Sequence, residues 1–381
     1  MSANKRVLFY VQHLLGIGHL KRAASLARAM NAAGLQVTIA SGGEPVDVLD
    51  RSGFDLVQLP PLRAADRTFQ GMVDEQGEAV DEAYLARRRA VLLEVLERVK
   101  PATLLVEMFP FGRRALRGEL LPLIEAAKGR GAQIVCSVRD ILVEKNRPDR
   151  EIEMVETARR WFDTILVHGD PDFIPFDATF VRARELANLI QYTGYVVEPV
   201  MPTGSQGRGE VIVSAGSSAT GEALLRTAQE VRARTSLAKA TWRLLAGQGL
   251  PEAVFDDLCR CADPGIVVER ARADFTTLLA NCALSISQGG YNTVMEVLAT
   301  GARAVLVPYA GGHETEQTLR ARRLAELGRV RQIPEGELSV AALAELVEKA
   351  SQDSPSPAPR IDLHGARKSA ELLASRLVSV R

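Results

Sequence analysis

The chain lacks several features that would point to particular classes of protein. Its 47 Lys and Arg residues balance 47 Asp and Glu residues, so there is no bulk positive charge to attract nucleic acid. No uninterrupted apolar run approaches the ~20 residues of a membrane span, and residues 1–6 lead directly into an apolar segment without the features of a signal peptide. We therefore expect a cytoplasmic protein with no nucleic-acid partner. Any contact with a membrane should be peripheral and at its inner face.

Cysteine is also scarce. The four cysteines are Cys136, Cys259, Cys261 and Cys282, and the Cys-Arg-Cys segment lacks the two-residue spacing and the second pair of a zinc site. Buried or incidental thiols are the favoured interpretation. We expect neither a metal site nor a bound cofactor.

The most informative pattern lies in the second half of the chain. A strand expected at residues 283–287 breaks at Gly289-Gly290 into a helix that ends at Gly301. Glycines let backbone N–H groups approach an anion, and a helix start presents unpaired donors and the positive end of its dipole. Glu296, near that start, could accept hydrogen bonds from sugar hydroxyls. On spacing alone, a tight turn with a dipole-compensating acid is an equally good interpretation.

A second glycine-containing loop follows the first expected strand, residues 6–11. Its sequence, Gln-His-Leu-Leu-Gly-Ile-Gly-His, is neither a P-loop nor a dinucleotide fingerprint. It places His19 at the start of a helix at the carboxyl edge of a parallel sheet, where ligands of open α/β folds bind. A histidine there can act as a general base, because its unperturbed pKa of ~6.5 lies near operating pH. The alternative is a histidine that caps the helix or contacts phosphate.

Polar residues also follow three other expected strands: Glu107, Arg139-Asp140 and His168. Since such exits gather at one edge of a sheet, we expect them to face the same site as His19. Glu107 could orient or replace His19 as the base. Arg113, a few residues later, could hold an anionic or hydroxylated acceptor. Taken singly, each of these residues is more often a structural ion-pair or capping residue than a functional one.

Apolar strands alternate with helical stretches throughout, which predicts two parallel, doubly wound α/β domains. Residues 199–209, rich in Pro and Gly, separate a first domain at residues 1–198 from a second at residues 210–360. Residues 60–82 have no clear apolar period and are expected to form a mobile loop over an acceptor site. Phe109 and Phe111 are expected to pack in the core.

Two segments resemble the nucleotide-sugar glycosyltransferases of family 28. The first is residues 285–317, with its small-residue loop, its glutamate and the polar pair Glu316-Gln317, where the family more often has two glutamines. The second is Gly-Ile-Gly-His-Leu-Lys-Arg, ending at Arg22, which is also similar to a loop of a related nucleotide-sugar hydrolase and lacks one glycine of the transferase form.

The resemblance implies the GT-B fold, in which two Rossmann-like domains face each other across a central cleft and a terminal helix, here residues 361–381, packs back on the first domain. It assigns His19 to catalysis and Arg22 to the matching basic position, which we expect to contact the acceptor. The strand exits add Glu107 as a second catalytic candidate and Arg113, Arg139 and Asp140 as candidates for acceptor binding. The donor-binding positions are Gly18, Gly216, Ser217, Ser218, Arg270, Gln288, Gly289, Gly290, Asn292, Glu296, His313, Glu316 and Gln317.

The resulting hypothesis is a metal-independent, inverting glycosyltransferase that moves a sugar from a UDP-sugar to a hydroxyl acceptor, for which the family offers a lipid-linked example. A nucleotide-sugar hydrolase, with water as the acceptor, is the second hypothesis. A non-catalytic nucleotide-sugar binder is the third. The basic helix expected at residues 113–130 is consistent with membrane contact, but its leucines give an ordinary core stripe, so we favour a surface helix.

Overall fold

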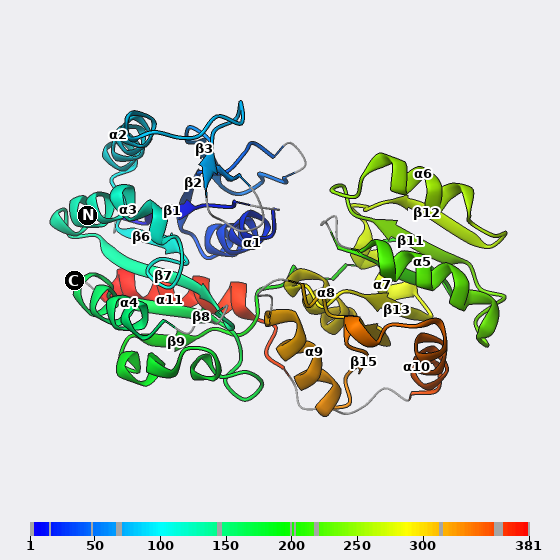
Figure 1. The fold of residues 1–381 in the computed structure, drawn as a ribbon. Coiled ribbons are helices and arrows are strands. Elements are labelled where there is room, and N and C mark those ends of the chain that lie inside the picture. Colours follow the sequence, from blue (N-terminus) through cyan, green and yellow to red (C-terminus); the bar gives the residue numbers. More distant parts are fainter. Residues whose placement is uncertain are drawn as a thin grey trace. The chain divides into compact units, whose positions relative to one another are not determined.

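The computed structural model describes residues 4–14, 17–46, 49–65, 71–142, 147–198, 200–201, 203–216, 221–311, 315–353 and 361–379. Contacts divide the chain into two compact units, Met1–Val196 with Ile361–Arg381, and Val197–Arg360. Each unit has its own parallel sheet and its own hydrophobic core (Figure 1). The expected pair of parallel-sheet α/β domains is therefore confirmed.

The first unit is built on a parallel sheet whose described strands lie in the order β3-β2-β1-β6-β7-β8-β9. Its strands are β1 Arg6–Val11, β2 Gln36–Ser41, β3 Asp55–Gln58, β6 Thr103–Glu107, β7 Gln133–Arg139, β8 Thr164–His168 and β9 Ile190–Tyr192. The strand order reverses direction between β1 and β6. Ligands of open parallel sheets bind beyond the carboxyl ends of the strands at such a switch point.

Helices cover both faces of this sheet, because alternate residues of a strand point to opposite sides. Leu8 and Tyr10 of β1 share a core with residues of α2 and α3, whereas Val7 and Phe9 share one with α1 and α11. Burying each such apolar side chain contributes about 1.5–3 kcal/mol. The helices are α1 Gly18–Ala32, α2 Glu82–Val99, α3 Arg117–Gly129, α4 Pro148–Trp161 and α11 Gly365–Ser379.

Residues 60–82, expected to form a mobile loop, contain a short element of regular structure. The described part contains a two-stranded antiparallel hairpin, β4 Arg63–Ala64 and β5 Met72–Val73. The Ala64 N–H donates to the Leu14 carbonyl at 3.1 Å. The sequence did not predict this structure, because main-chain hydrogen bonds leave no periodic pattern of apolar residues. Residues 66–70 lie outside the described residues.

The second unit has a parallel sheet whose described strands lie in the order β12-β11-β10-β13-β14-β15, with its switch point between β10 and β13. The strands are β10 Val211–Ser214, β11 Trp242–Ala246, β12 Ile266–Arg270, β13 Leu284–Ser287, β14 Ala304–Leu306 and β15 Arg331–Gln332. The helices are α5 Glu222–Val231, α6 Glu252–Arg260, α7 Phe275–Asn281, α8 Tyr291–Thr300, α9 Glu316–Glu326 and α10 Val340–Gln352.

The C-terminal helix α11 belongs to the first unit, where Ala370 and Leu373 join the core that contains α1 (Figure 1). Val196 and His364 form an antiparallel bridge, and the Tyr195 N–H donates to the Asp362 carbonyl at 2.7 Å. The segment where the chain leaves the first unit is therefore hydrogen-bonded to the segment where it re-enters that unit. Within the described ranges, every helix is too short or too polar to span a bilayer.

Candidate active site

In the first unit, two strand exits meet at the switch point. Helix α1 begins at Gly18, a few residues after β1, so His19 is the second residue of its first turn, and Glu107 is the last residue of β6. After Glu107, Met108 and Arg113 have positive φ angles of 67° and 59°. This left-handed backbone is unfavourable for residues with a side chain and is often found at functional sites.

Glu107 is the centre of the resulting cluster, and its side chain is only 1% exposed. His19 Nδ1 lies 2.5 Å from Glu107 Oε1, and Arg22 Nη2 donates to the same oxygen at 2.8 Å. Arg113 Nη2 donates to the other carboxylate oxygen at 3.3 Å. Because an ionised carboxylate can only accept, Nδ1 of His19 carries the proton and Nε2 carries the lone pair.

Electrostatics keep this histidine neutral. Burial lowers the pKa of His19 to about 4; Glu107 opposes that shift, but the Arg113 and Arg22 guanidiniums reinforce it. Burial alone would raise the pKa of Glu107, but the partners around it, led by His19 and Arg113, hold that pKa well below its usual range. At neutral pH the cluster therefore combines an ionised carboxylate with a neutral imidazole whose side chain is 20% exposed.

The other polar exits of this sheet lie deeper than the sequence suggested. His168 is fully buried, with Ser137 Oγ at 2.7 Å from Nε2 and Thr193 Oγ1 at 2.9 Å from Nδ1. His168 lies close enough to the cluster for Arg22 and Glu107 to act on its pKa, but its side chain is buried and hydrogen-bonded within the sheet edge. Phe109 and Phe111 are buried, which confirms their expected packing role.

Asp140 also departs from its expected role in binding an acceptor. It is fully buried and accepts a hydrogen bond from the Tyr195 hydroxyl at 2.7 Å. We assign it instead to holding the segment that leads out of the first unit. Arg139, the last residue of β7, is half-buried, and its role in acceptor binding stays a prediction.

Two side chains near this cluster were not singled out from the sequence. His13 is 5% exposed, its ring lies against Gly43, and both Arg113 and Glu107 influence its pKa, which burial lowers. Arg88 is fully buried and bound to Glu119. A lone histidine in a loop or an arginine in a charged helix has no distinctive spacing, so sequence patterns could not identify them.

In the second unit, the glycine loops also lie at the switch point. Gly216, just after β10, has a φ of 68°, and Gly289-Gly290 follow β13. Gly290 is the N-cap of α8, and no described side chain caps this helix. Helix starts of this kind bind phosphate through main-chain N–H groups. Ser217 and Ser218, assigned to the same loop as Gly216, lie outside the described residues, as does His313.

Close packing joins this loop to the start of α9. A Cβ atom placed on Gly289 would lie 3.2 Å from the Gln317 carbonyl oxygen, so only glycine fits there without displacement. Gln317 Oε1 in turn accepts from the Tyr309 N–H at 3.1 Å. The structure thus brings together the loop after β13 and the polar pair after β14, as the sequence indicated. Gln288 is buried, and Asn292 and Glu296 are half-buried.

Glu316 is held by a residue that the sequence analysis did not identify. Glu316 is 5% exposed and pairs with Arg320, one helical turn later, at 2.9 Å. The Arg320 guanidinium is fully buried and lies 5.2 Å from the centre of the Tyr291 ring, at the first residue of α8. Arg320 therefore links the starts of α8 and α9, and its charge balances that of Glu316.

Arg270, expected near the nucleotide base, uses its side chain locally. Its Nη1 donates to the carbonyls of Gly247 and Leu250 at 3.0 and 2.9 Å, and its guanidinium stacks on Phe255. These contacts fix the start of α6. We still predict that Arg270 contacts a nucleotide base, and this contact would be made by its main chain.

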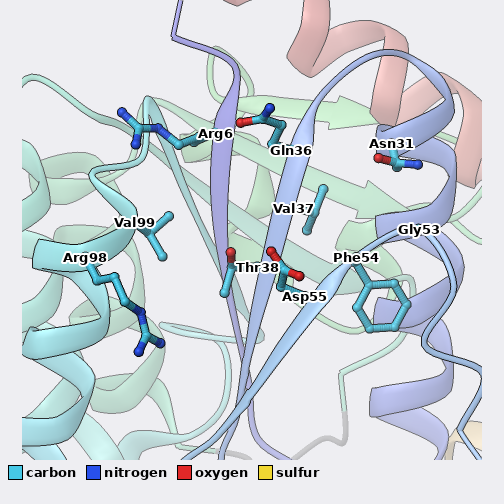
Figure 2. Close-up of a pocket in the computed structure, with 10 residues that line it drawn as sticks. All are labelled: Arg6, Asn31, Gln36, Val37, Thr38, Gly53, Phe54, Asp55, Arg98 and Val99. Carbon is cyan, nitrogen blue, oxygen red and sulfur yellow. The ribbon is translucent and has the colours of Figure 1, made fainter.

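A cavity of about 710 Å³ lies away from these groups (Figure 2). Figure 2 shows that Arg6, Gln36 and Asp55, the first residues of β1, β2 and β3, line it. It is therefore at the amino edge of the first sheet, opposite the switch point. The polar groups converge instead at the carboxyl edge, where ligands of parallel sheets bind. Among the described residues, no group of three potential metal ligands occurs.

Two parallel-sheet α/β units of this kind make up the GT-B fold. Residues 211–377 match the glycosyltransferase family 28 C-terminal domain. This part of the chain is therefore similar to the C-terminal domain of the family 28 glycosyltransferases.

Individual relatives agree with this assignment. The UDP-N-acetylglucosamine--N-acetylmuramyl-(pentapeptide) pyrophosphoryl-undecaprenol N-acetylglucosamine transferase of Methylorubrum populi is 26% identical, over 87% of this chain and 85% of the relative. The enzyme of the same name from Paracidovorax citrulli is 35% identical, but over only 21% of this chain and 23% of its own length. The crystal structure of Acinetobacter baumannii MurG has the same fold, with a TM-score of 0.59 and 15% identity over 97% of this chain and 99% of that one.

Proposed function

We propose that the protein is a metal-independent, inverting glycosyltransferase that transfers a sugar from a UDP-sugar to a hydroxyl acceptor. The observation that carries the proposal is the His19–Glu107 pair at the switch point of the first sheet, held between two arginines. Neutral imidazole with its lone pair on Nε2 is the form that a general base requires. The family 28 domain in residues 211–377 supports the nucleotide-sugar donor.

The proposed reaction is a single displacement. The acceptor oxygen attacks the anomeric carbon and its proton passes to His19 Nε2, while the bond from that carbon to the diphosphate oxygen breaks and the nucleoside diphosphate leaves. Glu107 keeps the Nδ1 proton in place and stabilises the imidazolium that forms. One in-line step on the side opposite the leaving group inverts the configuration of the sugar.

In this proposal the donor contacts belong to the second unit. The start of α8 and the main chain at Gly289 and Gly290 would bind the diphosphate, whose growing negative charge the helix dipole would stabilise without a cation. Glu296 would bind the ribose. Glu316, oriented by Arg320, and Gln317 would bind sugar hydroxyls.

The acceptor is proposed from the relatives. The names of both relatives above specify a pyrophosphoryl-undecaprenol acceptor, so a lipid-linked muramyl peptide is the first acceptor to test. Such an acceptor would bring a cytoplasmic enzyme to the inner face of the membrane as a peripheral protein. Arg22 and Arg113, which flank Glu107, are the side chains in this site that suit its anionic groups.

The test is a transfer assay with UDP-N-acetylglucosamine and this lipid-linked acceptor in buffer containing EDTA. The full chain should release UDP and form the glycosylated lipid in equal amounts. His19→Ala should lower kcat by about 10²–10⁴-fold, the usual contribution of a general base, while calorimetry gives an unchanged Kd for UDP. His364→Ala is the matched control, because the side chain of that histidine is 66% exposed and pairs with Asp362.

The alternatives give different results in the same assay. Free sugar formed in equal amount with UDP, whether or not the acceptor is present, would establish a hydrolase, for which the Gly18-His19 loop form is the supporting feature. UDP binding without any turnover would establish a binder. An active His19→Ala variant would remove His19 from the role of base.

A further inference from the structure

A second buried charged cluster lies in the first unit, separate from His19 and centred on Arg88 of α2. The Arg88 side chain is 0% exposed. Its Nε donates to Glu119 of α3 at 2.8 Å, and its Nη2 donates to Gln12 Oε1 at 2.5 Å. Its Nη1 donates to the carbonyl of Gly42 at 2.9 Å and also to that of Pro60. Since Nη2 also donates to the Tyr10 hydroxyl at 3.4 Å, one guanidinium binds three side chains and two main-chain carbonyls.

The charges of this cluster are retained inside the protein. Burial alone would lower the pKa of Arg88, but Tyr10 and Glu119 outweigh it and raise that pKa. Tyr10 donates its hydroxyl to Glu119 at 2.5 Å. A buried ion pair is weak evidence for stability, because desolvation offsets the attraction between the charges. What such a pair does well is to specify the positions of the groups bound to it.

The groups bound to Arg88 come from three neighbouring strand exits. Gln12 follows β1, Gly42 follows β2 and Pro60 follows β3, all at the carboxyl edge of the sheet. Arg88 packs directly against Gly42, since a Cβ atom placed on Gly42 would lie 2.1 Å from Arg88 Nη2. The Leu62 N–H also donates to the Gly42 carbonyl, at 2.9 Å, so the second and third exits are bonded directly to each other.

The first of these exits connects Arg88 to the proposed catalytic cluster. Gln12 Nε2 donates to the carbonyls of His13 and Leu62, each at 3.0 Å. The ring of His13 is close enough to Glu107 and Arg113 for both to act on its pKa. The same exit runs on to His19 at the start of α1.

We propose that Arg88, with Glu119 and Gln12, is a positioning group for the catalytic edge of the first unit. It fixes the exits of β1, β2 and β3 beside the His19–Glu107 pair, so that an acceptor hydroxyl meets Nε2 in the reactive geometry. The inference rests on the proposed function for its effect on catalysis. Arg88 acts through these exits and touches no substrate itself.

The test compares three variants: Arg88→Met, the double variant Arg88→Met/Glu119→Leu, and Arg89→Met as the control. Arg89 is the next residue of the same helix, but its side chain is 35% exposed, donates to the Gly118 carbonyl and pairs with Glu82. The single variant leaves Glu119 buried without its cation, so it should unfold at a lower midpoint concentration of urea. The double variant removes both charges and should recover most of that midpoint, because apolar replacement of a buried pair is often neutral.

The double variant then distinguishes an effect on the positioning of the site from an effect on stability. In the double variant we expect kcat/KM for the lipid-linked acceptor to stay about 10- to 100-fold below that of the wild type, the usual effect of a small displacement in an active site. The Kd for UDP should be unchanged. Hydrogen exchange at the Gly42 and Leu62 amides should be faster in the double variant, whereas Arg89→Met should match the wild type in every measurement.

A double variant with wild-type exchange at these amides and wild-type kcat/KM would overturn the proposal and leave the cluster a purely structural pair. Wild-type exchange at these amides overturns it whatever the kinetics show. If the wild type itself transfers no sugar, the proposed function fails, and the exchange measurement still decides whether Arg88 fixes the three exits.

Discussion

The balance of charge around His19 gives a prediction that needs no knowledge of the acceptor. Arg22 Nη2 lies 3.3 Å from His19 Nδ1. Two unit charges at that distance repel by about 1.3 kcal/mol even with the dielectric constant of bulk water, and by roughly fourfold more at an effective dielectric constant of ~20. Since 1.36 kcal/mol corresponds to one pKa unit, Arg22→Met should raise the pKa of His19 by about one unit or more from its value of about 4.

The sign follows from which form the arginine disfavours. The guanidinium destabilises the imidazolium, so removing it makes protonation easier and the pKa rises. Methionine keeps an apolar stem to fill the space of the arginine side chain. Glu107→Gln should act in the opposite direction, because Glu107 is the group that raises the pKa of His19.

The assay is an NMR titration of the histidine ring signals, assigned with a His19→Gln variant. In the wild type, the His19 ring should stay neutral to well below pH 6.5. In Arg22→Met it should titrate at higher pH, and the acid limb of kcat/KM should move by the same amount. A His19 pKa that is unchanged or lower in Arg22→Met would refute the electrostatic account.

Two further predictions concern the donor loop and the response to acid. Gly289→Ala should lower the free energy of unfolding, measured with urea, by about 1 kcal/mol, because its Cβ would lie 3.2 Å from the Gln317 carbonyl oxygen. A Cβ on Gly290 would meet no protein atom within 4 Å, so Gly290→Ala should keep the wild-type stability, and equal losses of stability would contradict the packing argument. The folded-state pKa values of His19 and His168, about 4 and about 3, lie below the unfolded value, so the unfolded state binds more protons as the pH falls below ~6.5. The free energy of unfolding, measured with urea, should be highest above pH ~6.5. As the pH falls from there towards the two folded-state pKa values, it should decrease by up to roughly 1.4 kcal/mol per pH unit for each histidine. An unfolding free energy that stays constant between pH 7.5 and 5 would show that the two rings are not buried in the neutral form.

The sequence predicted the parts of the fold that depend on local patterns. Apolar runs separated by helical periods identified the strands of both sheets, and Gly301, with φ of 68°, ends α8 where expected. The parallel topology then placed His19 and Glu107 at one edge, because strand exits gather there. The hairpin at β4 and β5 was missed because two-residue strands have no period.

The residues that hold the site together could not be found in this way. Arg88 and Arg320 lie on helices rich in charge, and only the tertiary structure shows that these two are fully buried while Arg89 and Arg322 are not. Asp140 shows the reverse error, and the side chain of His168 is likewise buried. A polar residue at a strand exit is equally consistent with a site and with a buried hydrogen bond, and the depth of each exit is set by neighbouring segments that are distant in the sequence.

The central claim is that His19 deprotonates an acceptor which attacks the donor in a single step. The most direct test is the anomeric configuration of the product formed from α-linked UDP-N-acetylglucosamine, read from the coupling constant of its anomeric proton by NMR. The account predicts a β-linked product from the wild type and almost none from His19→Ala. An α-linked product would contradict single-step inversion and, with it, the assigned role of the His19–Glu107 pair.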